Sequence, residues 1–480
     1  MNIPEDPSSL KEVVILLLAK VSSLEARVAE LESDNQALRS ENSVLSAENT
    51  ALKARLNLDS HNSSKPPSSD GLGKKPAFPR SSGNKRGGKD GHKGKTLDFS
   101  SCPDNIIECK AHHCTCGCDL SNLPSDVISR RQLFEIPEPR LEVTEYRVLS
   151  TQCPSCGLSH RGEFPLGVNA PVQYGPRTKS FITLLNNDCM LSVERIQNLF
   201  CDLFGYSINE NTIQTAVKIC YDKLESTQEW IKSKLISAKV ANFDETGLRC
   251  AGKLHWLHVA SNQLYTHLFV HPKRGKEAIE SDHSILNHYH QWAVHDCWSS
   301  YFNMEHPKHA ICGAHLLREL QAQIEGHSKW AGRFKDFLLE TFRTDFRDRI
   351  EKRDQIETEF DEIIQIGQLE EPEPKKNGKK GKTKRTKGRN LLERLLKYKH
   401  EVLAFAFNEM VPFTNNQAER DLRPAKVKQK VSGCFRTLLG AQHYARIAGF
   451  VSTVRKNNLN VFKELCNIFD DVPASITIAS

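Results

Sequence analysis

Two short apolar runs decide the fold: Val240-Ala-Asn-Phe-Asp244 and Gln291-Trp-Ala-Val-His-Asp296, each of which ends in a carboxylate. Short apolar runs that stop at a polar residue are typical of buried β-strands. Between them, 254–260 and 264–270 alternate like strands, with Ser261-Asn-Gln as the hairpin turn. We therefore expect a sheet in which two neighbouring strands each present an acid at one edge.

A third acid comes from a later helix. We choose Glu419, in Pro412-Phe-Thr-Asn-Asn-Gln-Ala-Glu419-Arg-Asp-Leu-Arg-Pro. Asn416-x-x-Glu419 also fits a capping box, in which the glutamate only reaches back to the helix start. Asp421 is a rival third acid, whereas Glu245 should point away from Asp244 because strand side chains alternate. A run of basic residues comes after Glu419, as expected of a helix that binds phosphate groups. These residues are Arg420, Arg423, Lys426, Lys428 and Lys430.

Three carboxylates that converge on one point suit Mg²⁺ or Mn²⁺, which prefer octahedral oxygen coordination. Two such ions about 4 Å apart activate a water or a 3′-OH and stabilise the leaving oxygen of a phosphodiester. Asp244, Asp296 and Glu419 are thus predicted catalytic metal ligands. Taken singly, each acid is more often a solvated surface group than a ligand.

The N-terminal segment carries a heptad pattern. Leucine recurs every seven residues from Leu10 to Leu52, and the partner positions hold valines, then asparagines, then Leu56. Leucine at d with valine at a favours a parallel two-stranded coiled coil, and buried asparagine fixes its register. We expect self-association through this segment, although an amphipathic helix that packs within its own chain would have the same pattern.

A linker and two basic blocks lie outside these elements. From His61 to about Ser100 the sequence is rich in Gly, Ser and Pro and contains Lys85 and Arg86, and Lys375 to Arg389 forms the second block. Such blocks cannot bury a core and suit contacts with DNA phosphates, but each taken alone is equally consistent with a solubilising linker.

Clustered cysteines predict a structural zinc site between 101 and 175. Cys153-Pro-Ser-Cys156-Gly is a knuckle that places two thiolates on one turn, and a second pair would close a four-ligand site. The first pair is open: His113-x-x-Cys116 has the usual spacing, and Cys114 with Cys116 or Cys118 is the alternative. Free thiols are the competing interpretation. The segment between the knuckles, 140–149, alternates like a strand.

Residues 176–235 have a helical pattern. Ser192-Val-Glu-Arg-Ile-Gln-Asn-Leu-Phe, then Phe204-Gly-Tyr-Ser-Ile, then Asn209-Glu-Asn-Thr-Ile-Gln-Thr-Ala-Val indicate a helix, a glycine-containing turn and a second helix. This is the plan of a helix-turn-helix DNA reader, but many helix pairs share it without touching DNA.

Composition narrows the class of protein. The 480 residues exceed what one core usually fills, and the net charge is only +7. The apolar run Val13 to Leu18 is too short to span a bilayer, and no secretory pattern opens the chain. We expect a cytoplasmic, nucleoid-associated protein whose fifteen cysteines are reduced and bind metal where they cluster.

Several blocks together resemble the large transposase of the Insertion Sequence 66 family. They are Asp244-Glu-Thr-Gly, Val294-His-Asp296-Cys-Trp-Ser-Ser-Tyr, Cys312-Gly-Ala-His-Leu-Leu-Arg-Glu-Leu and Thr414-Asn-Asn-Gln-Ala-Glu419-Arg-Asp-Leu-Arg-Pro. The resemblance extends to the leading heptads, the linker and the paired knuckles. It implies a ribonuclease-H-like core with an Asp-Asp-Glu triad at Asp244, Asp296 and Glu419. The first knuckle, His113-Cys-Thr-Cys-Gly-Cys, departs from the plain cysteine pair of the family.

The resemblance also implies the reaction and its partners. Hydrolysis would expose 3′-OH ends of a mobile element, and these would attack target DNA. Double-stranded DNA, a second copy of the chain and small companion proteins are the expected partners, with no membrane. The alternatives are a non-enzymatic DNA-binding protein on a degenerate core and a host nuclease that cleaves without joining.

The expected architecture is a multidomain α+β protein. Its predicted parts are a coiled coil over 1–58, a basic linker over 59–100, a zinc-binding module over 101–175, a helix-turn-helix-like region over 176–235, the first part of the core over 236–329, a helical insertion with a basic run over 330–410, the helix that completes the core over 411–456, and a C-terminal tail over 457–480.

Overall fold

The computed structural model describes residues 7–56, 97–374 and 385–478. Lys85, Arg86 and most of the second basic block lie outside the described residues. The chain divides into two compact units. The first unit holds 1–74, 292–302 and 308–415, and the second unit holds 75–291, 303–307 and 416–480. The stretch 236–329, expected as one part of the core, is thus shared between the units.

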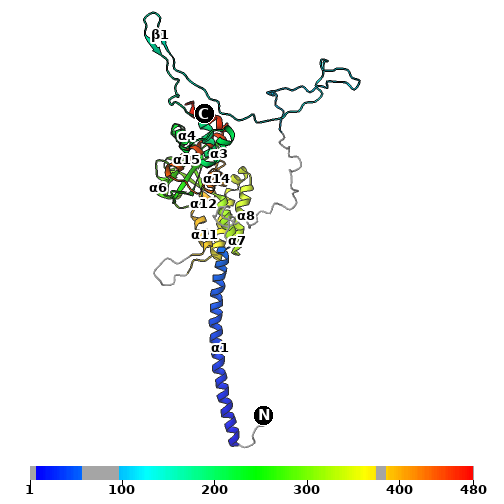
Figure 1. The fold of residues 1–480 in the computed structure, drawn as a ribbon. Coiled ribbons are helices and arrows are strands. Elements are labelled where there is room, and N and C mark those ends of the chain that lie inside the picture. Colours follow the sequence, from blue (N-terminus) through cyan, green and yellow to red (C-terminus); the bar gives the residue numbers. More distant parts are fainter. Residues whose placement is uncertain (1–6, 57–96, 375–384, 479–480) are drawn as a thin grey trace. The chain divides into compact units, whose positions relative to one another are not determined.

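The N-terminal segment is one continuous helix, α1 (Pro7–Leu56), drawn in blue in Figure 1. Those predicted a and d residues whose side chains the structure describes are exposed in this single chain: Leu24 is 58 % exposed and Leu31 is 59 % exposed. The helix is confirmed, and its pairing with a second copy remains a prediction.

The second unit is built on three antiparallel strands: β3 (Val240–Cys250), β4 (Lys253–Ser261) and β5 (Thr266–His271). The hairpin between β4 and β5 turns at Asn262, whose side chain accepts hydrogen bonds from the amides of Leu264 (2.9 Å) and Tyr265 (2.8 Å). This confirms the two alternating strands and the predicted turn.

Two helices cover one face of these strands: α14 (Asn416–Ser432) and α15 (Leu438–Lys456). The shared core includes Leu248, Val259, Leu268, Ala418, Leu422, Ala425 and Tyr444. Gly449 of α15 lies directly on β5, since a Cβ there would come within 3.1 Å of the Thr266 carbonyl oxygen. The helix can approach the strand this closely because residue 449 has no side chain.

A helical region precedes the strands in the second unit. Its elements are α2 (Pro176–Thr183), η2 (Leu184–Asp188), α3 (Val193–Phe204), α4 (Glu210–Lys223) and α5 (Glu225–Ile236). Ile182, Ile196, Phe200 and Ile213 meet in its core. The segment 457–480, treated from the sequence as a tail, holds α16 (Val461–Phe469) and α17 (Ser475–Ile478), and α16 packs on α2 and α4.

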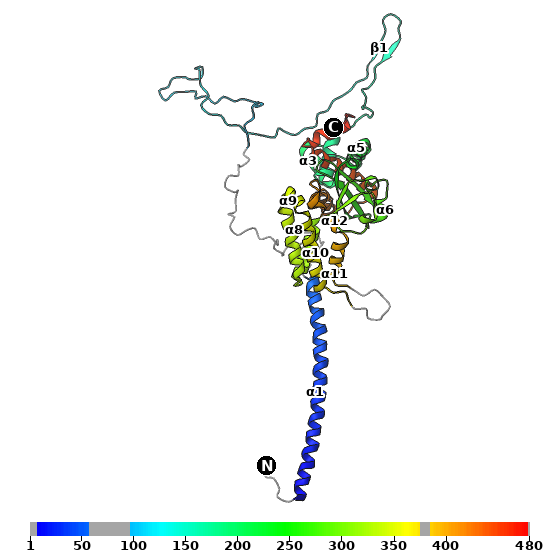
Figure 2. The same ribbon diagram turned by 180° about the vertical axis from the view of Figure 1, so that it is seen from behind.

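The first unit contains a parallel pair of strands and a set of helices. The strands are β6 (Trp292–His295) and β7 (Lys308–Ile311), followed by α7 (Gly313–Glu325). The predicted helical insertion consists of α8 (Lys329–Arg343), α9 (Phe346–Glu351), α10 (Arg353–Glu370), α11 (Lys387–Lys397), α12 (Lys399–Val402) and α13 (Ala404–Phe407). Helix α10 packs between α8 and α11, as Figure 2 shows.

Three short elements complete the described residues between β5 and β7: α6 (Lys276–Ile279), η3 (Leu286–His288) and η4 (Tyr301–Asn303). Each of them is only a single turn, and Ile279, Ile285 and Leu286 are buried within this stretch.

Residues 97–175 are mostly extended. They contain one antiparallel pair, β1 (Ser150–Gln152) with β2 (Ser159–Arg161). The strand predicted over 140–149 is wrong: the chain is irregular there and Val143 is 77 % exposed. Alternation alone does not make a strand when no neighbouring chain accepts its backbone hydrogen bonds.

Candidate catalytic site

Asp244 lies in β3 on the face of the strands that α14 covers. Side chains alternate along a strand, so Asp244 shares its face with Leu248, and its partner across the ladder is Val259. Leu248 and Val259 both belong to the core that Ala418 of α14 completes. Asp244 is therefore half-buried beneath the helix that carries the third predicted acid.

Asp244 and Glu419 lie at the same level of the second unit, because α14 runs in the same direction as β3. Lys426 Nζ donates to the Gly247 carbonyl oxygen (2.7 Å), and beyond the helix Phe435 pairs in parallel with the end of β3. Glu419 precedes Lys426 by seven residues, about 10.5 Å along a helix. Asp244 precedes Gly247 by three residues, about 10 Å along a strand. Since positions seven apart share a helix face, Glu419 is on the side of α14 that meets β3.

Glu245 occupies the opposite face of β3, as alternation predicts. Its side chain is 1 % exposed and pairs with Arg274, whose Nη2 lies 2.7 Å and whose Nε lies 2.8 Å from the same carboxylate oxygen. The Arg274 guanidinium in turn stacks 5.0 Å from the centre of the Trp256 ring. Glu245 is thus a structural partner of Arg274 and is separated from Asp244 by the strand itself.

Asp421, the rival third acid, is engaged in a buried ion pair. Its carboxylate lies 2.8 Å from Lys456 Nζ, and the two side chains are 7 % and 12 % exposed. It also accepts hydrogen bonds from Ser452 Oγ (3.2 Å) and Gln417 Nε2 (3.1 Å). This arrangement fastens α14 to α15 and leaves Glu419 as the better candidate for a metal ligand on this helix.

Asp296 follows β6 in the first unit, and a buried histidine fixes the backbone beside it. His295 Nδ1 donates to the Asp296 carbonyl oxygen, and its Nε2 accepts from His309 Nδ1 at 2.9 Å. Burial lowers the pKa of His295 to about 3, so the ring is neutral at physiological pH. The Asp296 carboxylate accepts a hydrogen bond from the Trp298 amide (3.0 Å), which shapes the turn after the strand.

An arginine of the insertion, which the sequence analysis did not single out, approaches this acid. Arg394 of α11 pairs with Glu319 of α7. Burial lowers the pKa of Arg394, but Glu319 foremost, together with Cys297 and Asp296, raises it above the usual value. The sequence signal for this pair was weak: Glu319 belongs to the motif that begins at Cys312, but nothing near Arg394 indicates that the two residues meet.

The end of β7 is hydrogen-bonded to the segment that leads into α14. Within the first unit, the Cys312 amide donates to the His295 carbonyl (2.9 Å), and the Gly313 amide donates to the Phe413 carbonyl (2.8 Å). The Asn415 amide then donates to Cys312 Sγ (3.1 Å). A Cβ at residue 313 would come within 2.3 Å of the Phe413 ring, so this contact requires glycine.

The basic residues of α14 differ in exposure. Arg420 and Arg423 are exposed. Lys428 is buried and its ammonium donates to the Asn186 carbonyl oxygen (2.6 Å), and burial lowers its pKa to about 8. Lys426 is half-buried on Gly247, so the two arginines are the better candidates for phosphate contacts.

The helix pair α3 and α4 has the predicted ends. Ser192 Oγ caps α3 by accepting from the Arg195 amide (3.3 Å), and Asn209 Oδ1 caps α4 by accepting from the Asn211 amide (2.8 Å). Gly205 ends α3 with a φ of +70°, a left-handed conformation that favours glycine. The helix, turn and second helix are present, and their contact with DNA remains a prediction.

The two cysteine turns are closed by similar hydrogen bonds but differ in length by one residue. In each, a glycine in the left-handed region donates at 2.9 Å to the carbonyl of a cysteine: Gly117 to Cys114, three residues earlier, and Gly157 to Cys153, four residues earlier. Cys114 corresponds to Cys153 by this hydrogen bond, whereas His113 corresponds to it by spacing from the glycine.

This correspondence bears on the open choice of ligands in the first turn. Cys116 then matches Cys156, and His113 lies before the turn. Hydrogen bonds from Cys116 lower the pKa of the Cys114 thiol, and hydrogen bonds from Cys156 lower that of Cys153. Each turn thus presents two sulfur atoms together. Across the part of the chain that the structure describes, no group of three or more His, Cys, Asp or Glu residues is placed to hold a metal ion.

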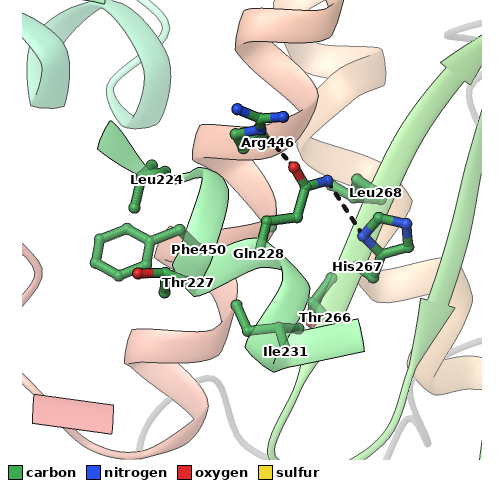
Figure 3. A pocket seen from close by; sticks show the side chains of 10 residues that line it. Leu224, Thr227, Gln228, Ile231, Thr266, His267, Leu268, Arg446 and Phe450 are labelled. Carbon is green, nitrogen blue, oxygen red and sulfur yellow. Dashed lines mark hydrogen bonds between the residues drawn. The ribbon is translucent and has the colours of Figure 1, made fainter. Parts of the chain in front are cut away.

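The second unit also contains a small cavity. Its volume is about 10 Å³, which is enough for a single water and too small for a larger ligand. Figure 3 shows a chain of polar groups along it, in which Arg446 Nε donates to Gln228 Oε1 and Gln228 Nε2 donates to His267 Nδ1. His267 Nε2 donates to the His283 carbonyl (2.8 Å), and burial lowers the pKa of His267 to about 4.

Antiparallel and parallel strand pairs combined with many helices define a mixed α+β protein. A family model described as Transposase IS66 family matches residues 171–443, more than half of the chain. The chain therefore belongs to the IS66 family of transposases, which confirms the resemblance seen in the motifs. Membership of this family suggests a DNA-cleaving and DNA-transferring enzyme of an insertion sequence. A second model, described as a family of unknown function, matches residues 13–98. No curated protein matches the chain. None of the described helices is long and apolar enough to cross a membrane.

Proposed function

We propose that this transposase cuts and joins DNA at one site formed by Asp244, Asp296 and Glu419. The observation that carries the proposal is the common level of Asp244 and Glu419 on the covered face of β3, in a chain that belongs to a transposase family. Two half-buried carboxylates at the same level of the second unit would supply hard oxygen ligands of the kind that Mg²⁺ prefers.

Connectivity supports Asp296 as the third ligand. The residue before it, His295, accepts from the Cys312 amide, and Cys312 Sγ accepts from the Asn415 amide. Asn415 directly precedes α14, which carries Glu419 four residues further on. Asp296 is included because it directly follows β6 within the motif block that resembles the transposase family, and because the segment that leads into α14 is anchored beside the same strand end in the first unit.

The proposed reaction has two phosphoryl-transfer steps. In the first, water attacks a phosphodiester at the element end, and the P–O bond to the 3′ oxygen breaks to leave a 3′-OH and a 5′-phosphate. In the second, that 3′-OH attacks a target phosphodiester, so that one P–O bond forms and another breaks. Bound divalent ions would lower the pKa of the attacking group and stabilise the leaving oxygen. The three carboxylates hold the ions, and Arg420 and Arg423 bind the DNA backbone.

The test uses the full chain and a supercoiled plasmid that carries the DNA flanking its gene. Asp244→Asn, Asp296→Asn and Glu419→Gln should each reduce Mg²⁺-dependent nicking by at least about 10³-fold, because each removes charge from a metal ligand. DNA binding in a gel-shift assay should change little. The matched control is Glu409→Gln, an exposed glutamate that should retain full activity. Full nicking by Glu419→Gln would refute the assignment, and binding without any nicking by the unaltered protein would favour the non-enzymatic alternative.

We also propose that α1 pairs with α1 of a second copy. Its leucines and valines recur at heptad spacing and stay exposed in the single chain, a row of apolar surface that a partner helix would bury. Changing Leu24 and Leu31 together to lysine should convert the dimer to a monomer in sedimentation analysis. The control is the pair Glu25→Lys and Glu32→Lys at neighbouring positions outside the a/d pattern. A monomeric unaltered protein would contradict the proposal.

Finally, we propose that the two cysteine turns share one structural zinc ion, held by Cys114, Cys116, Cys153 and Cys156. The hydrogen bond from the Gly117 amide to the Cys114 carbonyl, which parallels that from Gly157 to Cys153, supports Cys114 over His113 as the fourth ligand. Metal analysis of Cys114→Ser should show loss of zinc, whereas His113→Asn should retain it.

A further inference from the structure

The insertion of the first unit forms a pocket against the beginning of β6. Its volume is about 240 Å³, and Trp292, Arg353, Lys399 and Phe407 are among the residues that line it. Pockets for whole drug-sized ligands usually range from about 300 to 1,000 Å³. A pocket of this size therefore suits a single planar ring with a substituent, not an extended ligand.

The lining combines aromatic rings with cations. The Arg353 guanidinium lies 4.7 Å from the centre of the Phe407 ring and also contacts Glu357 Oε1 through its Nε at 3.0 Å. Across β6 and β7, Lys308 is the ladder partner of Trp292, and its ammonium lies 5.9 Å from the indole. Flat rings beside fixed cations are the combination on which bases stack while the adjoining phosphate is neutralised.

The balance of charge favours an anion by a small margin. Lys399 lines the pocket and pairs with Asp361 at 2.8 Å, as Arg353 pairs with Glu357. Lys308, at the Trp292 side, brings the count to three basic groups against two carboxylates. The surplus of one positive charge fits one phosphate group and argues against a purely apolar ligand.

The pocket also lies at a defined distance from the proposed chemistry. Trp292 opens β6 and Asp296 follows the same strand, four residues later, which is about 13 Å along a strand. Thirteen ångströms correspond to about four nucleotides of a stacked strand at 3.4 Å each. A DNA strand that reaches Asp296 is therefore long enough to place a nearby nucleotide at Trp292.

We propose that this pocket holds one unstacked nucleotide of the DNA substrate, with its base against Trp292 and Phe407 and its phosphate near Arg353 and Lys308. This inference rests on the proposed function, and it gives the helical insertion a role: its helices α10, α12 and α13 complete a nucleotide site that β6 begins. An unpaired nucleotide in the pocket would hold the strand in register with the carboxylates.

The experiment uses the full-length protein and two short duplexes, one perfectly paired and one with a single bulged iododeoxyuridine. The protein should bind the bulged duplex more tightly, and irradiation should crosslink the iodinated base to the peptide that contains Trp292 or Phe407. Trp292→Leu and Phe407→Leu should each weaken binding of the bulged duplex about 5- to 150-fold, the range for loss of base–aromatic stacking. Binding of the paired duplex should change less than about twofold by the same reasoning. Phe342→Leu, a matched change at an exposed phenylalanine of α8, should affect neither.

The outcomes separate the pocket from the catalytic proposal. If the unaltered protein nicks plasmid DNA but shows no preference for the bulge and no crosslink at the pocket, the pocket inference is wrong and the catalytic proposal stands. If it neither binds nor nicks DNA, both fail. Should Trp292→Leu not fold, the crosslink in the unaltered protein and Phe407→Leu still decide the matter. Crosslinking to the paired duplex alone would assign the pocket to backbone contact and overturn the inference.

Discussion

Removing either partner of the Asp421–Lys456 pair should destabilise the second unit, and removing both should cost less than the sum. Breaking a buried ion pair usually costs about 3–5 kcal/mol, because one charge is left without its partner. In Asp421→Asn, Lys456 keeps three oxygen acceptors, at Asn262 (2.8 Å), Tyr265 (3.2 Å) and Thr266 (2.6 Å), so we expect a loss near the lower limit, about 3 kcal/mol. In Lys456→Met, the Asp421 carboxylate keeps only the neutral donors Ser452 and Gln417, so we expect about 4 kcal/mol.

The double variant measures the coupling directly. With both charges removed, the free energy of unfolding should fall by at most about 4 kcal/mol, which gives a coupling energy of about 3 kcal/mol. Guanidinium unfolding followed by tryptophan emission is a suitable assay, because Trp230 packs edge-on against Tyr265 at a ring distance of 5.5 Å. Additive losses, or single losses below about 1 kcal/mol, would refute the buried pair and reopen Asp421 as a metal ligand.

Two further predictions concern stability. Burial lowers the pKa of both His258 and His267 to about 4, so below about pH 6.5 the unfolded chain binds protons that the folded chain does not. Each histidine should then lower the free energy of unfolding by about 2 kcal/mol as the pH falls from 7 to 5. The midpoint of urea unfolding should therefore depend less on pH in His267→Gln than in the unaltered protein. An unchanged pH dependence would contradict the lowered pKa of His267. Gly449→Ala should lower the free energy of unfolding by about 1–3 kcal/mol, because its Cβ would press on the Thr266 carbonyl. Gly332→Ala, at a helical glycine with open space around it, should leave the melting temperature unchanged or raise it. Equal effects of the two substitutions would refute the close approach of α15 to β5.

Local patterns were enough to predict β3 to β6 and the starts of helices α3 and α4, although the alternating stretch 140–149 forms no strand. Alternation marked β4 and β5, and the apolar run before Asp244 marked the start of β3. The two predicted helical segments begin at Ser192 and Asn209, whose side chains accept hydrogen bonds from amides within their own helix, and Gly205 lies in the predicted turn. In each case the interaction that forms the structure spans only a few residues.

Interactions between distant segments were not predictable in the same way. Lys456 meets Asp421 across thirty-five residues, and nothing near either residue indicates the pairing. Lys428 was expected to grip phosphate because basic residues follow Glu419, yet it is buried. The spacing of Ala418, Leu422 and Ala425 placed the next buried turn of α14 at 428, so helical periodicity held a signal that charge alone did not.

The contact of Gly313 with Phe413 and of Cys312 with Asn415 has a consequence for how the chain tolerates change. The hundred residues between these contacts leave the strand region and come back to it at almost one point. Because the two ends of this segment are held together, a change of length in its interior alters the entropy of closing it only slowly, with the logarithm of the length. The junction itself depends on the glycine at 313 and the sulfur at 312, while helices α12 and α13 of the segment also pack on β7.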